Sequence, residues 1–144
     1  MDELTFFVPG DPVGKARPRV SVRFGHAHAY TPAKTAAYEK TVATCAKAAM
    51  IAQQFEKVGK PAAVKLEIRA GFSVPKSWTK KKRAEALAGS LAHIVKPDAD
   101  NLAKAILDAL NDVLYADDSQ VTVCHVEKVY EDAPGVTVRI STVR

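Results

Sequence analysis

The sequence predicts an α+β fold: a single two-layer domain in which a mixed, mostly antiparallel sheet has helices packed on one face. The chain has 144 residues, which is enough for one domain with a buried core. Residues 62–74 alternate apolar and polar side chains, as a half-buried antiparallel strand does. Residues 31–57 instead repeat apolar side chains every three or four positions, which is typical of an amphipathic helix. Since no repeat or linker divides the sequence, we expect residues 1–144 to form one domain.

The N-terminal part is predicted to hold a strand, an irregular segment and a long helix. A short strand covers residues 5–8, and residues 11–30 are so rich in Pro, Gly and basic side chains that we expect a loop or an irregular hairpin. Thr31 is positioned to cap the helix, Pro32 fits its first position, and Gly59 lies beyond its end. The apolar stripe of this helix is predicted to be Tyr38, Val42, Cys45, Ala49 and Ala52.

The second half of the chain is predicted to add two helices and two closing strands. Thr79 can cap a short basic helix that ends at Gly89. The other predicted elements are an extended piece over residues 91–95, a helix over about residues 99–112, and strands over residues 120–130 and 136–141. The turn residues EDAPG separate the two strands.

The charge of the chain is uneven, although its net value is only +5. Basic residues dominate residues 15–40 and 76–83, whereas acidic residues concentrate between Asp98 and Asp132. This distribution suits a polyanion held around a cation-binding site, and it equally suits a solvated basic surface. No apolar run approaches the roughly 18 residues of a membrane span, and the N-terminus does not resemble a signal peptide. We therefore expect a cytoplasmic protein that binds no membrane, with Cys45 and Cys124 as reduced thiols.

Two acidic pairs form the central constellation of candidate site residues. Asp98 and Asp100 lie at the predicted start of a helix, within KPDADNLAKAILDAL. In one interpretation, one of them caps the helix and Asp100 heads an exposed ladder of ion pairs with Lys104 and Asp108. The second pair, Asp117 and Asp118, lies in the predicted turn YADDSQV. Four carboxylates in an otherwise basic chain would repel one another unless a cation lies between them, so a metal site is the second interpretation.

Carboxylates without nearby Cys or His ligands favour a hard cation, Mg²⁺, with Mn²⁺ as a substitute. Three carboxylates around such an ion leave positions open for phosphate oxygens and an attacking water, which is suited to phosphodiester hydrolysis. Lys104, one turn beyond Asp100, would add positive charge or orient that water. Zinc is disfavoured because the four histidines are scattered and no Cys/His cluster has zinc spacing.

The segment from Lys96 to Val121 resembles the signature of RusA-type Holliday junction resolvases, endodeoxyribonucleases common in phages and prophages. The resemblance consists of a D-x-D-N-x-x-K helix start followed by a D-D-x-Q-V turn and strand. PVGKARPRV and AYTPAKTAAYE also resemble the phage-type branch, while residues 57–92 carry no shared motif. The resemblance implies that Asp98, Asp100 and Asp118 bind Mg²⁺, that Lys104 is essential, and that Asp117 is less critical. It also implies a homodimer that nicks opposed strands of a four-way DNA junction in recombination and repair.

The basic residues are candidates for binding a branched DNA substrate. The predicted DNA-binding set is Lys15, Arg17, Arg19, Arg23, Lys80, Lys81, Lys82 and Arg83. The run from Lys80 to Arg83 also fits a solvated helix face. Phe24 and Tyr30 fit either a core or dimer contact, or stacking on DNA bases at the branch point. A DNA-binding or scaffolding protein without catalysis is the alternative function.

Overall fold

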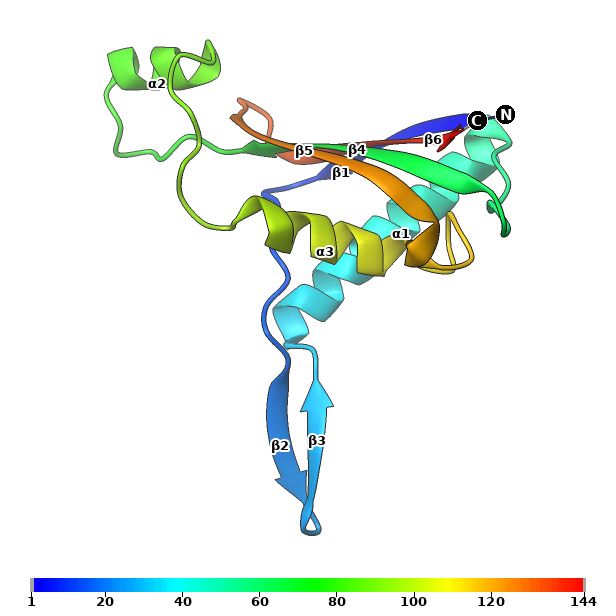
Figure 1. Ribbon diagram of the computed structural model, residues 1–144. Helices are drawn as coiled ribbons and strands as arrows, with labels where there is room; N and C mark the ends of the chain where they lie inside the picture. Colours follow the sequence, from blue (N-terminus) through cyan, green and yellow to red (C-terminus); the bar gives the residue numbers. More distant parts are fainter. Residues whose placement is uncertain (1, 144) are drawn as a thin grey trace.

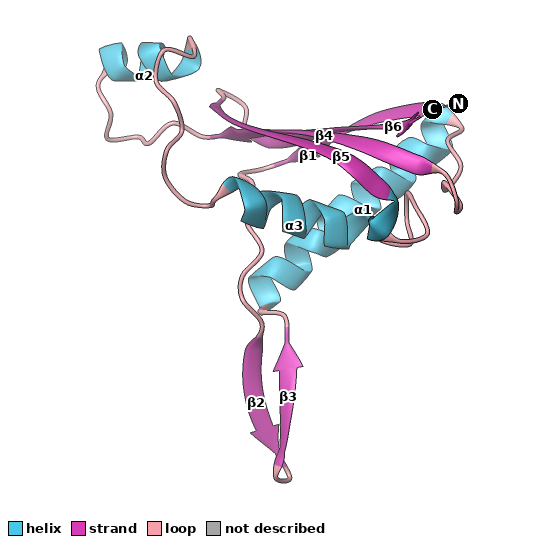
Figure 2. Ribbon diagram, in the orientation of Figure 1, coloured by secondary structure: helices cyan, strands magenta, loops and turns pink. Residues whose placement is uncertain are grey.

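The computed structural model describes residues 2–143, in which a four-stranded sheet carries two helices on one face (Figure 1). Figure 2 shows this two-layer body with a separate two-stranded ribbon that projects from it. The elements are β1 (Glu3–Pro9), β2 (Arg19–Arg23), β3 (His26–Tyr30), α1 (Ala33–Gln53), β4 (Ala63–Phe72), α2 (Lys80–Leu87), α3 (Ala99–Leu110), the 3-10 turn η1 (Asp118–Gln120), β5 (Val121–Tyr130) and β6 (Gly135–Val143). The predicted α+β class is confirmed.

The sheet has the strand order β1-β6-β4-β5. β6 pairs antiparallel with both β1 and β4, whereas β4 and β5 run parallel. The prediction that β4 is antiparallel therefore holds on its β6 side and is wrong on its β5 side. A parallel pair needs a long crossover, and here the crossover contains α2 and α3. This connection leaves α3 on the helical face of the sheet (Figure 1).

The core lies between the sheet and the helices α1 and α3. The alternation in β4 is confirmed, because Val64, Leu66 and Ile68 are buried toward the helices. The buried face of α3 is Leu102, Ala105, Ile106, Ala109 and Leu110. In α1 the deepest contacts come from Thr35, Val42 and Ala46, while Ala52 is exposed in contrast to its predicted place on the apolar stripe. Among residues 2–143, no helix has the length and apolar character needed to cross a membrane.

Local signals at the helix ends predict one helix correctly and another wrongly. The Thr79 side chain accepts a hydrogen bond from the Lys82 backbone N–H, at 3.2 Å, so the predicted cap of α2 is confirmed. The prediction that Thr31 caps α1 is wrong. Pro32 holds the N-cap position with extended backbone, and its carbonyl accepts from the Ala36 N–H at 3.0 Å. The fixed φ of proline suits this position whatever the side chain before it.

Two segments differ from their predicted form. Residues 91–95 form no strand; the linker between α2 and α3 is instead held by His93, whose ring stacks on Phe72 with centroids 3.9 Å apart. Residues 19–30 form a regular hairpin rather than an irregular one. Its turn has positive φ at both central residues, 51° at Phe24 and 78° at Gly25. Such turns match the twist of paired strands, which explains the regular ribbon.

Candidate active site

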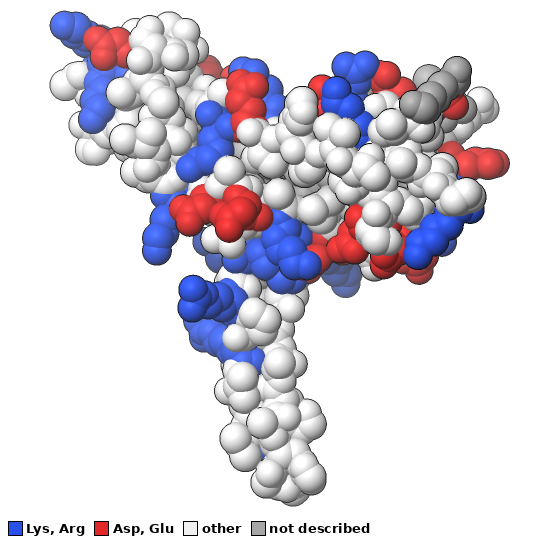
Figure 3. Space-filling view, viewed as in Figure 1, with Lys and Arg blue, Asp and Glu red and all other residues white. Residues whose placement is uncertain are grey.

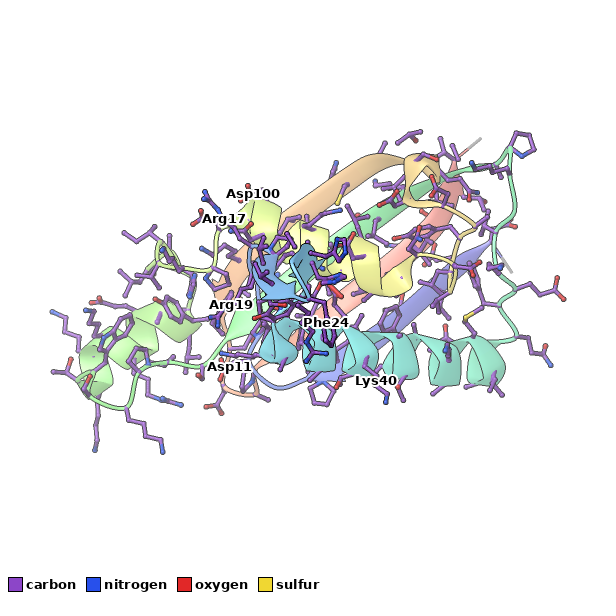
Figure 4. All side chains as sticks on the ribbon, turned by 90° about the horizontal axis from the view of Figure 1, so that it is seen from below. Asp11, Arg17, Arg19, Phe24, Lys40 and Asp100 are labelled. Atoms are coloured by element: carbon purple, nitrogen blue, oxygen red, sulfur yellow. The ribbon has the colours of Figure 1, made fainter. Side chains whose placement is uncertain are left out.

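A groove of about 880 Å³ lies where the N-terminal end of α3 meets the segment before β2 and the start of α1. Two acidic residues, Asp98 and Asp100, line it together with five basic ones: Lys15, Arg17, Arg19, Lys34 and Lys96. Figure 3 shows Lys and Arg side chains gathered where the ribbon joins the body, with acidic side chains beside them. Seen from below, Asp100 and Arg17 lie next to each other at the start of α3 (Figure 4). The groove therefore combines carboxylates with an excess of cations.

Asp98 and Asp100 have carboxylates without partners in the folded chain. Asp98 holds the N-cap position of α3, yet its side chain makes no capping hydrogen bond. Asp100 lies in the first helical turn, and no hydrogen bond or ion pair engages either carboxylate among residues 2–143. Capping therefore does not explain this pair. Both carboxylates lie at the positive end of the helix dipole, where negative charge is favoured.

Lys15 ties the segment before β2 to both helices. Its ammonium contacts Glu39 Oε1 of α1 at 2.6 Å and Asp108 Oδ2 of α3 at 3.1 Å, and its backbone N–H donates to the Asn101 carbonyl at 2.8 Å. Burial by itself lowers the pKa of this lysine, but the hydrogen bonds to Glu39 and Asp108 outweigh it and raise the pKa. The sequence predicts that Lys15 grips phosphate; the structure instead commits its charge to two carboxylates.

Lys104 points along α3 toward Asp108. Its Nζ donates to Asp108 Oδ1 at 2.8 Å, so only the second half of the predicted Asp100–Lys104–Asp108 ladder forms. The hydrogen bond to Asp108 raises the pKa of Lys104, and the nearby charge of Asp118 adds to the effect. Lys104 therefore stays a cation at neutral pH, which suits electrostatic stabilisation rather than proton abstraction.

The second acidic pair is built into the turn before β5. The Asp117 carboxylate accepts from the Ser119 N–H at 3.1 Å, while the Gln120 side chain accepts from the Asp117 N–H at 2.9 Å. These contacts form a capping box, and the hydrogen bonds from Ser119 lower the pKa of Asp117. The Asp118 N–H donates to Asn111 Oδ1 at 2.9 Å. Asp117 thus has a structural role, while the Asp118 carboxylate lies in the electrostatic field of Lys104.

The structure gathers two of the three predicted metal ligands, Asp98 and Asp100, in one groove. Among residues 2–143, no three His, Cys, Asp or Glu side chains are close enough together to hold a metal ion. Asp118 does not line the groove. Its negative charge instead helps to raise the pKa of Lys104 and of Tyr115. The three-carboxylate metal site therefore stays a prediction.

The remaining basic residues fall into two groups. Arg17, Arg19 and Arg23 are exposed, and the first two line the groove. In α2, Lys82 Nζ lies 4.0 Å from the centroid of the Trp78 ring, and Arg83 pairs with Asp132 at 2.7 Å. Of the four basic residues of this helix, Lys80 and Lys81 make no such contact with the described part of the chain. These two stay candidates for a DNA contact remote from the groove.

Sequence reasoning did not single out two of the groove's cations, Lys34 and Lys96. Lys96 directly precedes Pro97 and Asp98, so its place beside the acidic pair could have been inferred from the motif. Lys34 is distant in sequence and reaches the groove only because the start of α1 packs there. The segment before β2 packs closely against the start of α3 at Gly14, because a Cβ at that position would lie only 2.6 Å from Pro97 Cβ.

Comparison with known proteins confirms the family resemblance seen in the sequence. A family model described as endodeoxyribonuclease RusA matches residues 9–141, which include the groove, the ribbon and both acidic pairs. The chain is also similar to the uncharacterized protein YqaN of Bacillus subtilis (strain 168), with 38% identity over 145 residues that cover 99% of each chain. On the strength of this match along nearly its whole length, the chain belongs to the RusA family of endodeoxyribonucleases.

Proposed function

We propose that this protein is a Mg²⁺-dependent, structure-selective endodeoxyribonuclease that resolves four-way DNA junctions in recombination and repair. The observation that carries the proposal is the groove, in which two unpartnered carboxylates, Asp98 and Asp100, face the same space as five basic residues. A surface that only binds DNA has no use for two acids beside the phosphate path, because they repel it. A cation between acids and phosphate removes that conflict.

The donor set in the groove fits magnesium. Asp98 and Asp100 offer only oxygen atoms, and magnesium is commonly held in proteins by one or two carboxylates together with waters and substrate phosphates. When bound, Mg²⁺ would polarise the phosphodiester and offset the charge that develops on it, and Mn²⁺ would serve the same purpose. We retain Asp118 as the third proposed ligand on the basis of the motif.

The chain's own cations would do the remaining work. Arg17, Lys34 and Lys96 would bind the phosphates on either side of the cleaved bond and fix the strand in the groove. Lys104, which is held protonated by Asp108, would stabilise the negative charge that develops in the transition state.

We also propose that the active form is a homodimer. A four-way junction has two-fold symmetry, and a dimer with C2 symmetry places one site on each of two opposed strands. A second copy is also a candidate source of the third carboxylate, since Asp118 does not line the groove of its own chain and precedes β5, the outer strand of the sheet. Such an enzyme would act in the cytoplasm, where Cys45 and Cys124 remain thiols.

The test compares nicking of a mobile four-way junction with nicking of a linear duplex of the same sequence, each with and without Mg²⁺. We expect paired nicks only in the junction and only with Mg²⁺. Ca²⁺ should support binding without cutting, because its larger and looser coordination shell does not match the geometry that magnesium imposes. Junction binding in Mg²⁺ without any nicks would favour the alternative, a branched-DNA binding or scaffolding protein that lacks catalysis.

A further inference from the structure

Phe24 is an aromatic side chain for which the fold itself offers no contact. It lies at the tip of the ribbon formed by β2 and β3, where it is 99% exposed. A core contact, which the sequence allows, is therefore excluded. Its backbone has φ 51°, in the left-handed region that bulky residues rarely adopt. Residues held in such a conformation are often functional, because a plain turn would place Gly or Asn there.

The ribbon that carries Phe24 has two different faces. The pairs Arg19–Tyr30, Ser21–His28 and Arg23–His26 alternate with the pairs Val20–Ala29 and Val22–Ala27, so the first set shares one face and the second set the other. The first face is cationic and rich in hydrogen-bonding groups. Residues 12–38 contain no Asp or Glu at all. The ribbon is thus a basic arm, and Arg19 belongs both to the arm and to the groove that holds Asp98 and Asp100.

We propose that this arm lies along a DNA duplex and that Phe24 inserts its ring between bases at the branch point. The inference rests on the proposed function, since it requires DNA in the groove. The major groove of DNA admits a two-stranded ribbon. Other DNA-binding proteins, which bind the minor groove, insert apolar side chains between base steps and unstack them. A second copy of the chain is a poorer occupant, because two arms packed on each other would bring surfaces of the same positive charge together.

The length of the arm fixes where the effect should occur. The five residues of β2 span about 17 Å at 3.3–3.4 Å per residue, which corresponds to about five base-pair steps of DNA. The ring should therefore act within about five base pairs of the phosphate held in the groove. Unstacking costs less where base stacking is already interrupted, as it is at a branch point, and this gives the ring a preferred site there.

The experiment uses the full-length protein and synthetic four-way junctions that carry 2-aminopurine at successive positions near the branch, in Ca²⁺. Binding of the wild type should increase the fluorescence of at least one of these positions, because an unstacked 2-aminopurine is brighter. Phe24→Ala should remove the fluorescence increase at saturating protein. It should also weaken junction binding by about 5- to 150-fold, the range expected for loss of stacking on one base. Phe24→Trp should preserve the fluorescence increase.

Two control variants separate the ring from the turn. Phe24→Asn accepts left-handed backbone readily, so a loss of fluorescence in this variant reports the missing ring and not a damaged hairpin. Ile51→Thr changes an apolar side chain that is 82% exposed near the end of α1, outside both the ribbon and the groove, and it should behave as wild type.

Three results would overturn the inference. The first is a wild-type increase that persists in Phe24→Ala. The second is a wild type that binds and cuts junctions without brightening any scanned position. The third is a Phe24→Ala protein that sediments as a monomer while the wild type is a dimer, which would make Phe24 a contact between copies. A wild type that neither binds nor cuts junctions would instead refute the proposed function, and this inference with it.

Discussion

The two acidic pairs look alike in the sequence, but the folded chain uses them differently. Asp98 and Asp100 make no hydrogen bond through their carboxylates and line a basic groove, as far as residues 2–143 show. Asp117 accepts from the Ser119 N–H and closes a capping box with Gln120. The difference teaches that the spacing of carboxylates does not reveal which of them are engaged by the backbone, and that an unengaged carboxylate at a helix start is the better ligand candidate.

The largest expected effect comes from the free pair. Asp100→Asn should reduce Mg²⁺-dependent nicking of a four-way junction to below about 1% of wild type, the scale on which removal of one transition-state interaction acts. Binding in Ca²⁺ and thermal stability should change little, because the Asp100 carboxylate has no partner to lose in the described chain. Gel-based nicking and binding assays on the same junction measure both. Full activity in this variant would refute the metal assignment.

A mixing experiment sharpens the role of Asp118. If each site combines Asp98 of one copy with Asp118 of the other, Asp98→Asn and Asp118→Asn homodimers are both inactive, but their heterodimer contains one intact site. When equal amounts of the two variants are refolded together, half of the C2 dimers are mixed, and each mixed dimer has one intact site of two. About a quarter of all sites should then be intact, and nicking should return to about a quarter of the wild-type level. A mixture that stays inactive would place all ligands in one chain.

Lys104→Ala should lower the cleavage rate by about 100-fold, because the proposed function assigns to Lys104 the stabilisation of negative charge in the transition state. Its exposed ion pair with Asp108 contributes only about 0.3–0.5 kcal/mol to folding, and Asp108 keeps its contact with Lys15. Because the pKa of Lys104 is raised, this residue should not titrate near neutral pH. The pH profiles of wild type and variant should therefore have the same shape in that range. A variant that loses stability while cutting normally would return Lys104 to a structural role.

Asp117→Ala tests the other side of the comparison, with an effect on folding and not on chemistry. The folded chain lowers the pKa of Asp117 below its usual value of 3.8, so its contribution to stability is present above that pH and is lost as the pH falls through the lowered pKa. The variant should melt at a lower temperature than wild type at pH 7, and the two curves should approach each other in strong acid. Junction cleavage should remain close to wild type.

The smallest effect is expected in α2. Replacing Lys80 and Lys81 with alanine should reduce the slope of log binding constant against log salt by about 0.9 for each phosphate that these lysines neutralise. Lys82 and Arg83 are left in place because they interact with Trp78 and Asp132. Arg17→Ala, in the groove, is the matched comparison and should also reduce this slope, because Arg17 is proposed to bind a phosphate. An unchanged slope would mean that Lys80 and Lys81 only face solvent.

Prediction from the sequence was strongest where one local pattern decides the structure. Alternation along β4 and the apolar face of α3 both predicted buried side chains that the core confirms. The cap at Thr79 follows from its position before a basic helix. Prediction was weakest where neighbours compete: Pro32 displaces Thr31 at the start of α1, and His93 fixes residues 91–95 by stacking on Phe72 instead of pairing as a strand.

The sequence by itself determined the α+β class, the positions of most elements and the motif of a RusA-type nuclease, because hydrophobic periodicity and short motifs act over a few neighbouring residues. Only the tertiary structure decided which charges are free. Lys15 is bound by Glu39 and Asp108, Asp117 is engaged in a turn, and Asp98 and Asp100 face a groove with Arg17. The physical reason is that an ion pair depends on distances between segments far apart in the chain, which packing sets and local spacing does not contain.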